Sequence, residues 1–230
     1  MIQGLIFDKD GTLFDFQSSW GGWFAHLLAN MAGANAPLYA ELARRMDFDI
    51  ATERFNPGSI FIAGTSEDMV AAIIDLMPSH TPQTLRQHMR AIAGEPAQVP
   101  AIPLAPYLEA LRANGLRLGV ATNDGESSAR AQLQTAGVLD HFHAVAGYDS
   151  GFGAKPAPGM LFGVASALGL PASALAMVGD SAHDMHSGKA AGMHRIAVLT
   201  GTASYDDLAP HADIVLNHIG EIPDYLAKAT

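Results

Sequence analysis

Two aspartates near the start of the chain, Asp8 and Asp10, have a spacing that could place both carboxylates in one chemical site. They follow the apolar run Leu5-Ile6-Phe7, in the block Asp8-Lys9-Asp10-Gly11-Thr12. Residues two apart in an extended segment point to the same side, so we expect these carboxylates to converge and Lys9 to point elsewhere. Two like charges held close together are unfavourable unless a cation lies between them or one is protonated. The alternative interpretation is an ordinary turn after a strand, where Asp and Gly are common.

Two more polar side chains follow later apolar runs. Thr122 comes directly after Val120-Ala121 and before Asn123, and hydroxyl and backbone N–H groups at such a strand-to-helix turn can bind an anion. Lys155 stands in the loop Gly153–Pro158, next to two proline residues and ahead of a helical pattern. Each has an ordinary alternative, because Thr often caps a helix and a loop Lys is usually solvated.

A second pair of aspartates ends another apolar run, Met177-Val178-Gly179-Asp180. Asp184 follows four residues later, which places it one turn into the next helix, where it could simply complement the helix dipole. Asp180 is harder to explain in this way, since Gly179 permits close backbone approach and the preceding run has the pattern of a buried strand.

Together these side chains indicate one chemistry. In an open parallel sheet, ligands bind beyond the carboxyl ends of the strands, which is where all of these groups are predicted to fall. Carboxylates hold a hard divalent cation, and a cation, a Lys and a Thr together neutralise a phosphoryl group. One Asp is then available to attack phosphorus and form an acyl phosphate.

The elements that must position these groups are strands alternating with helices. Short apolar runs rich in β-branched residues predict strands at residues 2–8, 116–123, 143–148, 174–180, 195–200 and 212–216. Helical spacing fills the intervals, with Pro near the starts and Gly near the ends of several segments. This alternation predicts an α/β fold, a doubly wound parallel sheet, because parallel strands require crossover connections.

Residues 16–90 have a different pattern. Trp20, Trp23 and Phe24 begin an apolar stripe at helical spacing, and residues 38–46 and 69–77 are also predicted to be helical. We find no convincing strand pattern here. We therefore expect a catalytic core of residues 1–15 and 91–230, interrupted by a small helical domain of residues 16–90. The Pro-rich stretch of residues 96–106 is the expected return linker.

Composition excludes several classes of protein. The chain has 230 residues, of which 49% are hydrophobic, so a sizeable core is expected and wholesale disorder is not. Its net charge of −10 and the absence of Lys/Arg runs argue against non-specific binding to nucleic acid or to an anionic membrane. The chain has no Cys, which excludes disulfides and thiolate chemistry. With no leader-like or membrane-spanning apolar segment in the sequence, a cytoplasmic protein is the expectation.

The order of these motifs resembles the haloacid dehalogenase (HAD) superfamily. Asp8-Lys9-Asp10-Gly11-Thr12 is similar to its first motif, D-x-D-G-T, and Thr122 and Lys155 match the second and third. The fourth motif, G-D-x-x-x-D, is matched by Gly179-Asp180 together with Asp184. A helical insertion directly after the first motif resembles the cap of the phosphoglycolate phosphatase-like and β-phosphoglucomutase-like branches. The resemblance implies a HAD-like Rossmannoid core with this cap.

The resemblance also implies catalytic roles. Asp8 is expected to attack the phosphoryl group, and Asp10 to protonate the leaving oxygen and then activate water. Thr122 and Lys155 complete the expected catalytic set. Substrate binding is expected from Gly11, Thr12, Thr122, Asn123 and Lys155, with Thr122 and the Asn123 backbone N–H on phosphate oxygens.

Mg²⁺ is the cofactor that the resemblance implies. Its expected ligands are the carboxylate of Asp8, the backbone carbonyl of Asp10, and Asp180, with Asp184 as a direct ligand or as a partner of Lys155. The expected reaction is hydrolysis of a small phosphorylated metabolite, such as a phosphoglycolate-like phosphomonoester, through an aspartyl-phosphate on Asp8.

The helical insertion is expected to act as a lid over the leaving group. Its candidate contact residues are the polar and basic side chains near its loops, each of which could equally be solvated surface: Arg44, Arg45, Arg54, Ser59, Thr65 and Ser66. Trp20 and Trp23 are expected to pack in the core or hinge of this insertion. No His pattern typical of a metal site occurs, and His183 is expected to face solvent.

Other functions stay open on the sequence alone. A phosphomutase of the β-phosphoglucomutase type would keep the same motifs, although the stretch Thr12-Leu13-Phe14-Asp15-Phe16 differs from the usual sequence there. A receiver-type signalling domain would be much shorter, with its phosphorylated Asp on a middle strand. A non-catalytic protein that binds a phospho-ligand would be expected to have lost at least one of Asp8, Asp10, Lys155 and Asp180, and all four are present.

Overall fold

The computed structural model describes residues 2–56, 58–63, 66–93 and 97–228. The chain divides into two compact units. The core unit comprises Met1–Phe16 and Gln98–Thr230, and the insertion unit comprises Gln17–Ala97. Each unit is described by itself below.

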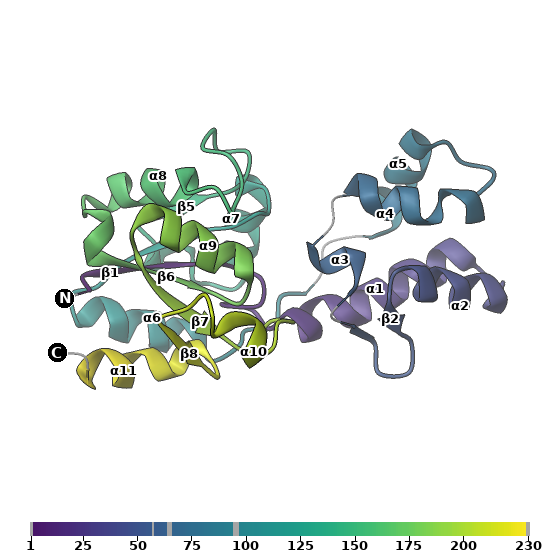
Figure 1. Ribbon diagram of the computed structural model, residues 1–230. Coiled ribbons are helices and arrows are strands. Elements are labelled where there is room, and N and C mark those ends of the chain that lie inside the picture. The colour runs from purple at the N-terminus through teal and green to yellow at the C-terminus, as the bar shows by residue number, and fades with distance from the viewer. Residues whose placement is uncertain (1, 57, 64–65, 94–96, 229–230) are drawn as a thin grey trace. The chain divides into compact units, whose positions relative to one another are not determined.

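The core unit is built on a six-stranded sheet in the order β5-β4-β1-β6-β7-β8, and all of its strand pairs are parallel (Figure 1). Every residue of β1 and β6 is buried, as expected for strands covered on both faces. The predicted doubly wound α/β fold is therefore confirmed. The strands are β1 (Gly4–Phe7), β4 (Arg117–Ala121), β5 (Ala144–Ala146), β6 (Leu175–Gly179), β7 (His194–Val198) and β8 (Ile214–Leu216).

Helices cover both faces of this sheet (Figure 1). Leu5 and Phe7 of β1 pack in one apolar cluster with α6, α7 and α11, whereas Ile6 packs in a second cluster with α8 and α9. The alternation of side chains along a strand produces these two layers. The helices are α6 (Leu104–Ala113), α7 (Glu126–Thr135), α8 (Gly159–Leu168), α9 (Ala182–Ala191), α10 (Tyr205–Leu208) and α11 (Ile222–Lys228).

The position of β1 matters most for function. It lies between β4 and β6. After β1 the chain adds β4 and β5 on one side of it, and then adds β6, β7 and β8 on the other side. Such a switch in strand order leaves a crevice beyond the carboxyl ends of the strands, where ligands bind in open α/β sheets. Asp8, Thr122 and Asp180 directly follow β1, β4 and β6, so these three neighbouring strands deliver them to the same edge.

The insertion unit is mainly helical, as expected. Its elements are α1 (Phe16–Ala32), α2 (Ala36–Arg45), β2 (Phe48–Asp49), β3 (Arg54–Phe55), α3 (Ile60–Ala63), α4 (Ser66–Ile73), the short 3₁₀ helix η1 (Ile74–Leu76) and α5 (Pro82–Ala93). The expected insertion ends at residue 90, but this unit continues to Ala97, because α5 packs against α4 and buries Leu85. None of the helices in the described ranges is both long and apolar enough to cross a bilayer.

The expectation of no strand in residues 16–90 is wrong. Phe48–Asp49 and Arg54–Phe55 form an antiparallel pair. Two-residue strands are too short to produce the alternating pattern by which a strand is predicted from sequence. The pair is tied to α1 by Gln17, whose side chain donates to the Phe55 carbonyl and accepts from the Phe55 N–H, both at 2.9 Å.

Phe24 is the centre of the insertion unit's core. Its side chain is fully buried, and its ring centroid lies 5.1 Å from that of Phe48 and 4.9 Å from those of Phe55 and Phe61. Trp20 and Trp23, predicted to pack in this unit, lie beside the cluster and are partly buried. Aromatic residues thus hold together helices and strands that are individually short.

Truncation of this centre should destabilise the insertion unit. We expect Phe24→Ala to lower the free energy of unfolding of this unit by about 3–5 kcal/mol, since it removes a buried aromatic side chain. The chain's two Trp residues both lie on α1, so Trp fluorescence during urea denaturation follows this unit selectively. Ile50→Ala, which truncates a partly exposed side chain of the same unit, is the control and should shift the midpoint little. Equal shifts in the two variants would show that the Phe24 cluster is not the core.

Candidate active site

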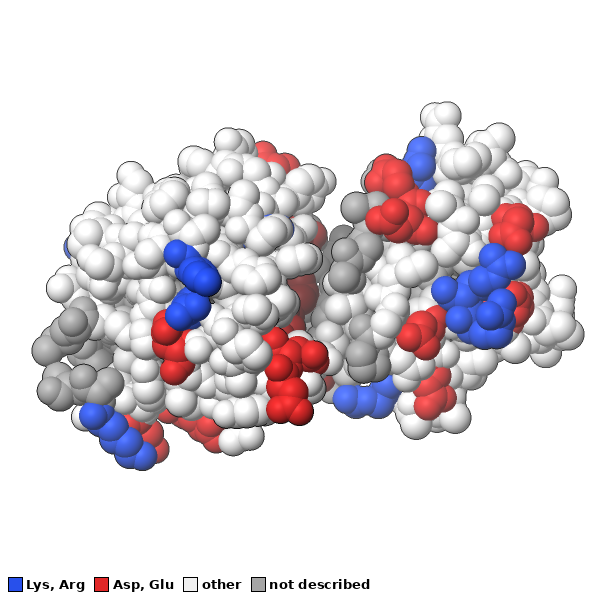
Figure 2. Space-filling view, in the orientation of Figure 1, with Lys and Arg blue, Asp and Glu red and all other residues white. Residues whose placement is uncertain are grey.

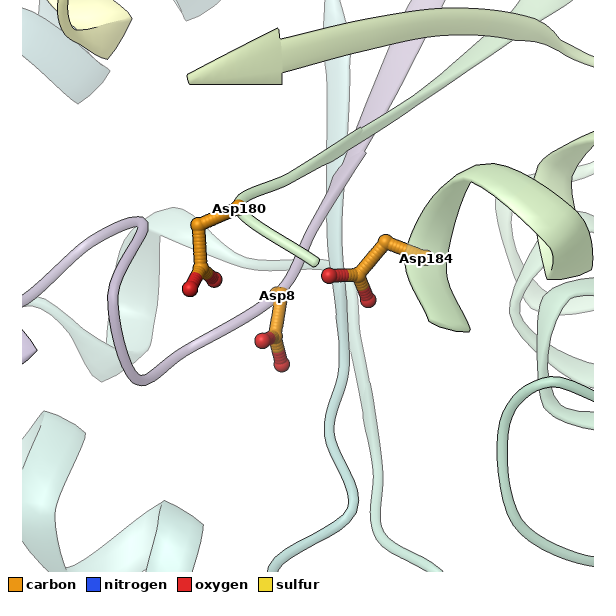
Figure 3. Close-up of side chains that lie close together, drawn as sticks. All are labelled: Asp8, Asp180 and Asp184. Atoms are coloured by element: carbon orange, nitrogen blue, oxygen red, sulfur yellow. The ribbon is translucent and has the colours of Figure 1, made fainter. Parts of the chain in front are cut away.

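Three carboxylates converge at the carboxyl edge of the sheet. Oxygen atoms of Asp8, Asp180 and Asp184 all lie within 4.8 Å of one another (Figure 3). Asp8 and Asp180 come from the ends of neighbouring strands, whereas Asp184 extends towards them from the first turn of α9. Asp184 is fully buried and the other two are nearly so. Residues far apart in the sequence are therefore brought into one site, as the motif order led us to expect.

Lys155 places a buried ammonium group against this cluster. Its Nζ lies 2.7 Å from Asp8 Oδ1 and donates a hydrogen bond of 2.6 Å to Asp184 Oδ1. The contact with Asp8 is an ion pair whose angles do not meet hydrogen-bond geometry. The solvated-surface interpretation of this Lys is therefore wrong, because the loop between β5 and α8 carries its side chain inward.

Asn123 fixes the backbone that carries Lys155. The Asn123 side chain accepts from the Lys155 N–H at 2.8 Å and donates to the Lys155 carbonyl at 3.0 Å. This pair of bonds joins the loop after β4 to the loop after β5. Only the backbone N–H of Asn123 was expected in the site, so the sequence did not predict this positioning contact of its side chain.

Asp184 has both a structural and an electrostatic role. Ser181 is the N-cap of α9, with its hydroxyl accepting from the Asp184 N–H at 3.3 Å and its own N–H donating to Asp184 Oδ2 at 3.1 Å. This reciprocal capping box fixes the Asp184 carboxylate while its other oxygen faces Lys155. Asp184 therefore lies at the helix terminus and also contacts Lys155, while its role as a metal ligand stays a prediction.

Gly11 and Thr12 make room for Asp180 and hold it in place. The Thr12 hydroxyl donates to Asp180 Oδ1 at 3.1 Å. Gly11 has φ of +80°, and a Cβ at this position would lie 2.3 Å from Asp180 Oδ2. Gly201 approaches Asp180 even more closely, since a Cβ there would lie 1.8 Å from Oδ2. Gly11 is therefore required both for the turn and for the position of the carboxylate.

Thr122 is buried at the end of β4, and its hydroxyl accepts a hydrogen bond of 3.1 Å from the Asp124 N–H. This bond lies within the loop and does not cap α7, whose N-cap is Gly125 and has no side-chain capping bond. A hydroxyl that accepts one bond can still donate its proton, so the same group is able to bind a phosphate oxygen.

Asp10 lies apart from the three-carboxylate cluster. Within the described part of the chain, the carboxylates grouped at metal-ligand distances are those of Asp8, Asp180 and Asp184. The Asp10 carboxylate accepts from Lys9 Nζ instead, at 2.8 Å. The expectation that Lys9 points away from its neighbours is wrong, because its long side chain is buried and its ammonium group returns to Asp10. Only the Asp10 backbone carbonyl was expected to bind metal, and this expectation stays a prediction.

The polar residues suggested for the insertion form mostly local contacts. Arg44 and Arg45 both pair with Glu41 of α2, and Arg45 also pairs with Asp75. The Ser59 hydroxyl is buried and donates to the Met46 carbonyl at 2.5 Å. Arg54 is exposed on β3, while Thr65 and the side chain of Ser66 lie outside the described residues.

The electrostatics of the site follow from burying three carboxylates around one ammonium group. Burial raises the pKa of Asp8 to about 7; Lys155 opposes this shift, and Asp184 adds to it. Burial and the charge of Asp8 also raise the pKa of Asp180 above its usual range. Although burial opposes protonation of Lys155, Asp184 and Asp8 raise the pKa of this ammonium group. A further cation is the natural means of keeping all three carboxylates ionised.

The donor set fits Mg²⁺. The cluster offers only carboxylate oxygens, which hard divalent cations prefer, and Mg²⁺ is typically held by one or two carboxylates with water completing its shell. Asp8 Oδ1 is buried without a hydrogen bond of good geometry, as expected for an atom that has a further ligand to accept. Asp8 and Asp180 would hold the ion, with Asp184 beside it.

Substitution of Gly11 tests whether Mg²⁺ affinity depends on the position of the Asp180 carboxylate. We expect Gly11→Ala to lower Mg²⁺ affinity by about 10–100-fold, since a methyl group would displace a ligand carboxylate. Gly151→Ala is a matched control, because Gly151 has φ of +86° but nothing within 4 Å of its Cβ position. Both variants incur the same kind of backbone strain. Titration calorimetry with MgCl₂ compares them, and equal affinities would contradict the assigned role of Asp180.

The chain is similar to known proteins. The sequence model of haloacid dehalogenase-like hydrolases matches residues 2–192. The "Probable phosphatase IndB" of Dickeya dadantii is 30% identical, over 95% of this chain and 90% of that protein. A phosphoglycolate phosphatase of Rhodospirillum rubrum is 31% identical, over 93% of this chain and 90% of that protein.

A solved structure shares the fold. The HAD family hydrolase of Deinococcus radiodurans, crystallised with bound phosphate and sodium, has a TM-score of 0.71 and is 20% identical, over 99% of this chain and 96% of that one. The resemblance in the motifs is therefore confirmed: the chain belongs to the haloacid dehalogenase-like hydrolases, in the branch that contains these phosphatases.

Proposed function

We propose that this protein is a Mg²⁺-dependent phosphatase that hydrolyses small phosphomonoesters through an aspartyl-phosphate on Asp8. The observation that carries the proposal is the buried cluster of Asp8, Asp180 and Asp184 beside Lys155. Phosphoryl transfer depends mostly on positioning and on neutralisation of charge, and this cluster provides the means for both.

Each residue of the site has a distinct part in this reaction. Asp8 attacks phosphorus, and the bond between phosphorus and the leaving oxygen breaks as Asp10 gives that oxygen a proton. Thr122 and the Asn123 N–H bind the phosphoryl oxygens, while Lys155 offsets the charge on Asp8 and on the phosphoryl group. When bound, Mg²⁺ would neutralise further negative charge at the Asp8–Asp180 side.

The intermediate is then hydrolysed. Asp10, now a carboxylate, takes a proton from water as the water oxygen attacks phosphorus. The bond from phosphorus to Asp8 breaks, which releases inorganic phosphate and restores the Asp8 carboxylate. A phosphomutase would instead transfer the phosphoryl group to a second hydroxyl of a sugar phosphate.

The substrate class is supported by the relatives and by the charge of the chain. One relative is a phosphoglycolate phosphatase, which favours a small phosphorylated acid as substrate. The chain has a net charge of −10, and on the face that Figure 2 draws, Lys and Arg stand in separated groups beside acidic residues. Such a surface does not favour nucleic acid or an anionic membrane. A cytoplasmic location and a lid role for the insertion unit stay predictions from the sequence.

The nucleophile can be tested by removing its charge. We expect Asp8→Asn to lower hydrolysis of p-nitrophenyl phosphate at least about 10³-fold, because an amide cannot form the acyl phosphate. Rapid acid quenching of the unaltered protein with a radiolabelled substrate should leave a hydroxylamine-labile phosphoryl group on the protein, and Asp8→Asn should carry none. Asp224→Asn on the exposed face of α11 is the control with full activity expected. Substantial turnover by Asp8→Asn would rule out this assignment.

The metal can be tested through the pH dependence of its stabilising effect. Because the pKa of Asp8 is raised to about 7, the folded metal-free protein holds a proton that the unfolded chain has already lost. This group therefore lowers stability as pH rises from its ordinary pKa towards 7, and Mg²⁺ must displace that proton in order to bind.

We accordingly expect millimolar MgCl₂ to raise Tm more at about pH 8 than at about pH 5. For a chain of this size, each 1 kcal/mol of added stability raises Tm by about 2–4 °C. Differential scanning calorimetry measures the shift. Asp180→Asn should lose most of it, and excess chelator should remove both the shift and the activity. Equal shifts at the two pH values would contradict the linkage of metal and proton.

A further inference from the structure

Lys9 is a buried lysine that the proposed reaction does not use. It stands between the two motif aspartates, and its side chain is completely buried. A buried ammonium group is costly unless it is paired and hydrogen-bonded. The partners of the Lys9 ammonium group therefore indicate the role of this residue.

Three acceptors surround the Lys9 ammonium group. Its Nζ donates to Asp10 Oδ1 at 2.8 Å and to Gln132 Oε1 at 2.5 Å, and it lies 2.7 Å from Asp10 Oδ2. Asp124 Oδ2 lies 3.5 Å away. The contacts with Asp10 Oδ1 and Gln132 Oε1 are hydrogen bonds, and those with Asp10 Oδ2 and Asp124 Oδ2 are ion pairs. Both carboxylate oxygens of Asp10 thus face one fixed cation.

The other two acceptors are themselves held in place. Gln132 is buried on α7, and its Nε2 donates to Ser128 Oγ at 3.3 Å on the same helix. Asp124 Oδ1 accepts from the Gly125 N–H at 2.7 Å in the loop after β4. Lys9 therefore contacts α7 and the loop after β4, and these contacts fix the position of the ammonium group that Asp10 faces.

Each of the two lysines of the site contacts a different aspartate of the first motif. Lys155 contacts Asp8 and Asp184, whereas Lys9 contacts Asp10. The side chain of Asp10 is 21% exposed and has rotatable bonds, so burial alone does not fix its direction. A group that transfers a proton must be held to within about 0.5 Å of its productive position.

We propose that Lys9 is a positioning residue for proton transfer by Asp10, anchored by Gln132 and Asp124. The inference rests on the proposed function, in which Asp10 protonates the leaving oxygen as the phosphorus–oxygen bond breaks. Lys9 itself exchanges no proton with substrate and acts only through the orientation of Asp10. Loss of Lys9 should therefore slow hydrolysis only of those substrates whose leaving group needs a proton.

A series of aryl phosphates tests this. We expect Lys9→Met to lower kcat/KM for phenyl phosphate by about 100-fold, and for p-nitrophenyl phosphate by less than about 3-fold, because nitrophenolate leaves without a proton. The ratio kcat/KM reports the steps up to loss of the leaving group, so slow hydrolysis of the intermediate does not mask the difference. The two substrates share a ring, which keeps the binding contribution similar.

Companion variants separate positioning from general damage. Asp10→Asn should show the same selective loss, and Lys9→Met/Asp10→Asn should be no worse than Asp10→Asn alone, since both changes remove one function. Lys189→Met, which removes an exposed lysine of α9, should leave both substrates unaffected. The double variant Lys9→Met/Gln132→Leu removes the buried donor and its buried acceptor together. We expect this variant to fold even if Lys9→Met alone does not.

The outcomes distinguish this inference from the proposed function. Selective loss with phenyl phosphate, in Lys9→Met or in the double variant, supports the positioning role. Equal loss with both substrates, while the unaltered protein keeps Asp8-dependent hydrolysis, would overturn the role of Lys9 and leave the proposed function intact. Absence of Asp8-dependent hydrolysis in the unaltered protein would overturn both.

Discussion

The site depends on one electrostatic constraint: three buried carboxylates lie close together, and a single ammonium group contacts two of them. Asp8, Asp180 and Asp184 bring three negative charges to one point, and Lys155 supplies one positive charge. Burial raises the pKa values of Asp8 and Asp180 and so favours their protonated forms, in which Asp8 could not attack phosphorus. In the proposed reaction a divalent cation and the substrate-binding donors would offset this imbalance, and the oxygen-only donor set fits such a cation.

The fold makes this concentration of charge possible. Neighbouring parallel strands deliver Asp8 and Asp180 to the same edge, while Ser181 at the start of α9 holds Asp184 in a capping box. Glycines at positions 11 and 201 leave space for the Asp180 carboxylate. The site is therefore organised by backbone geometry: Asp8 and Asp180 follow strand ends, and Asn123 holds the loop that carries Lys155.

The sequence predicted the sheet well because its strands are largely apolar runs, and β1, β4 and β6 are each followed directly by an acidic or polar residue. It predicted Asp8, Thr122 and Asp180 at one edge for the same reason. It could not predict that Lys9 reaches Gln132 or that the Asn123 side chain binds the Lys155 backbone, because these contacts join residues distant in the sequence. The two-residue strands β2 and β3 were missed because no periodicity exists at that length.

We expect a divalent cation to replace a proton at the carboxylate cluster. Titration calorimetry of MgCl₂ into the protein near pH 6.5, repeated in buffers of different ionisation enthalpy, measures the protons released on binding. Our account predicts saturable binding with release of a large fraction of a proton, reduced in Asp8→Asn. Absence of binding, or binding without proton release, would contradict it.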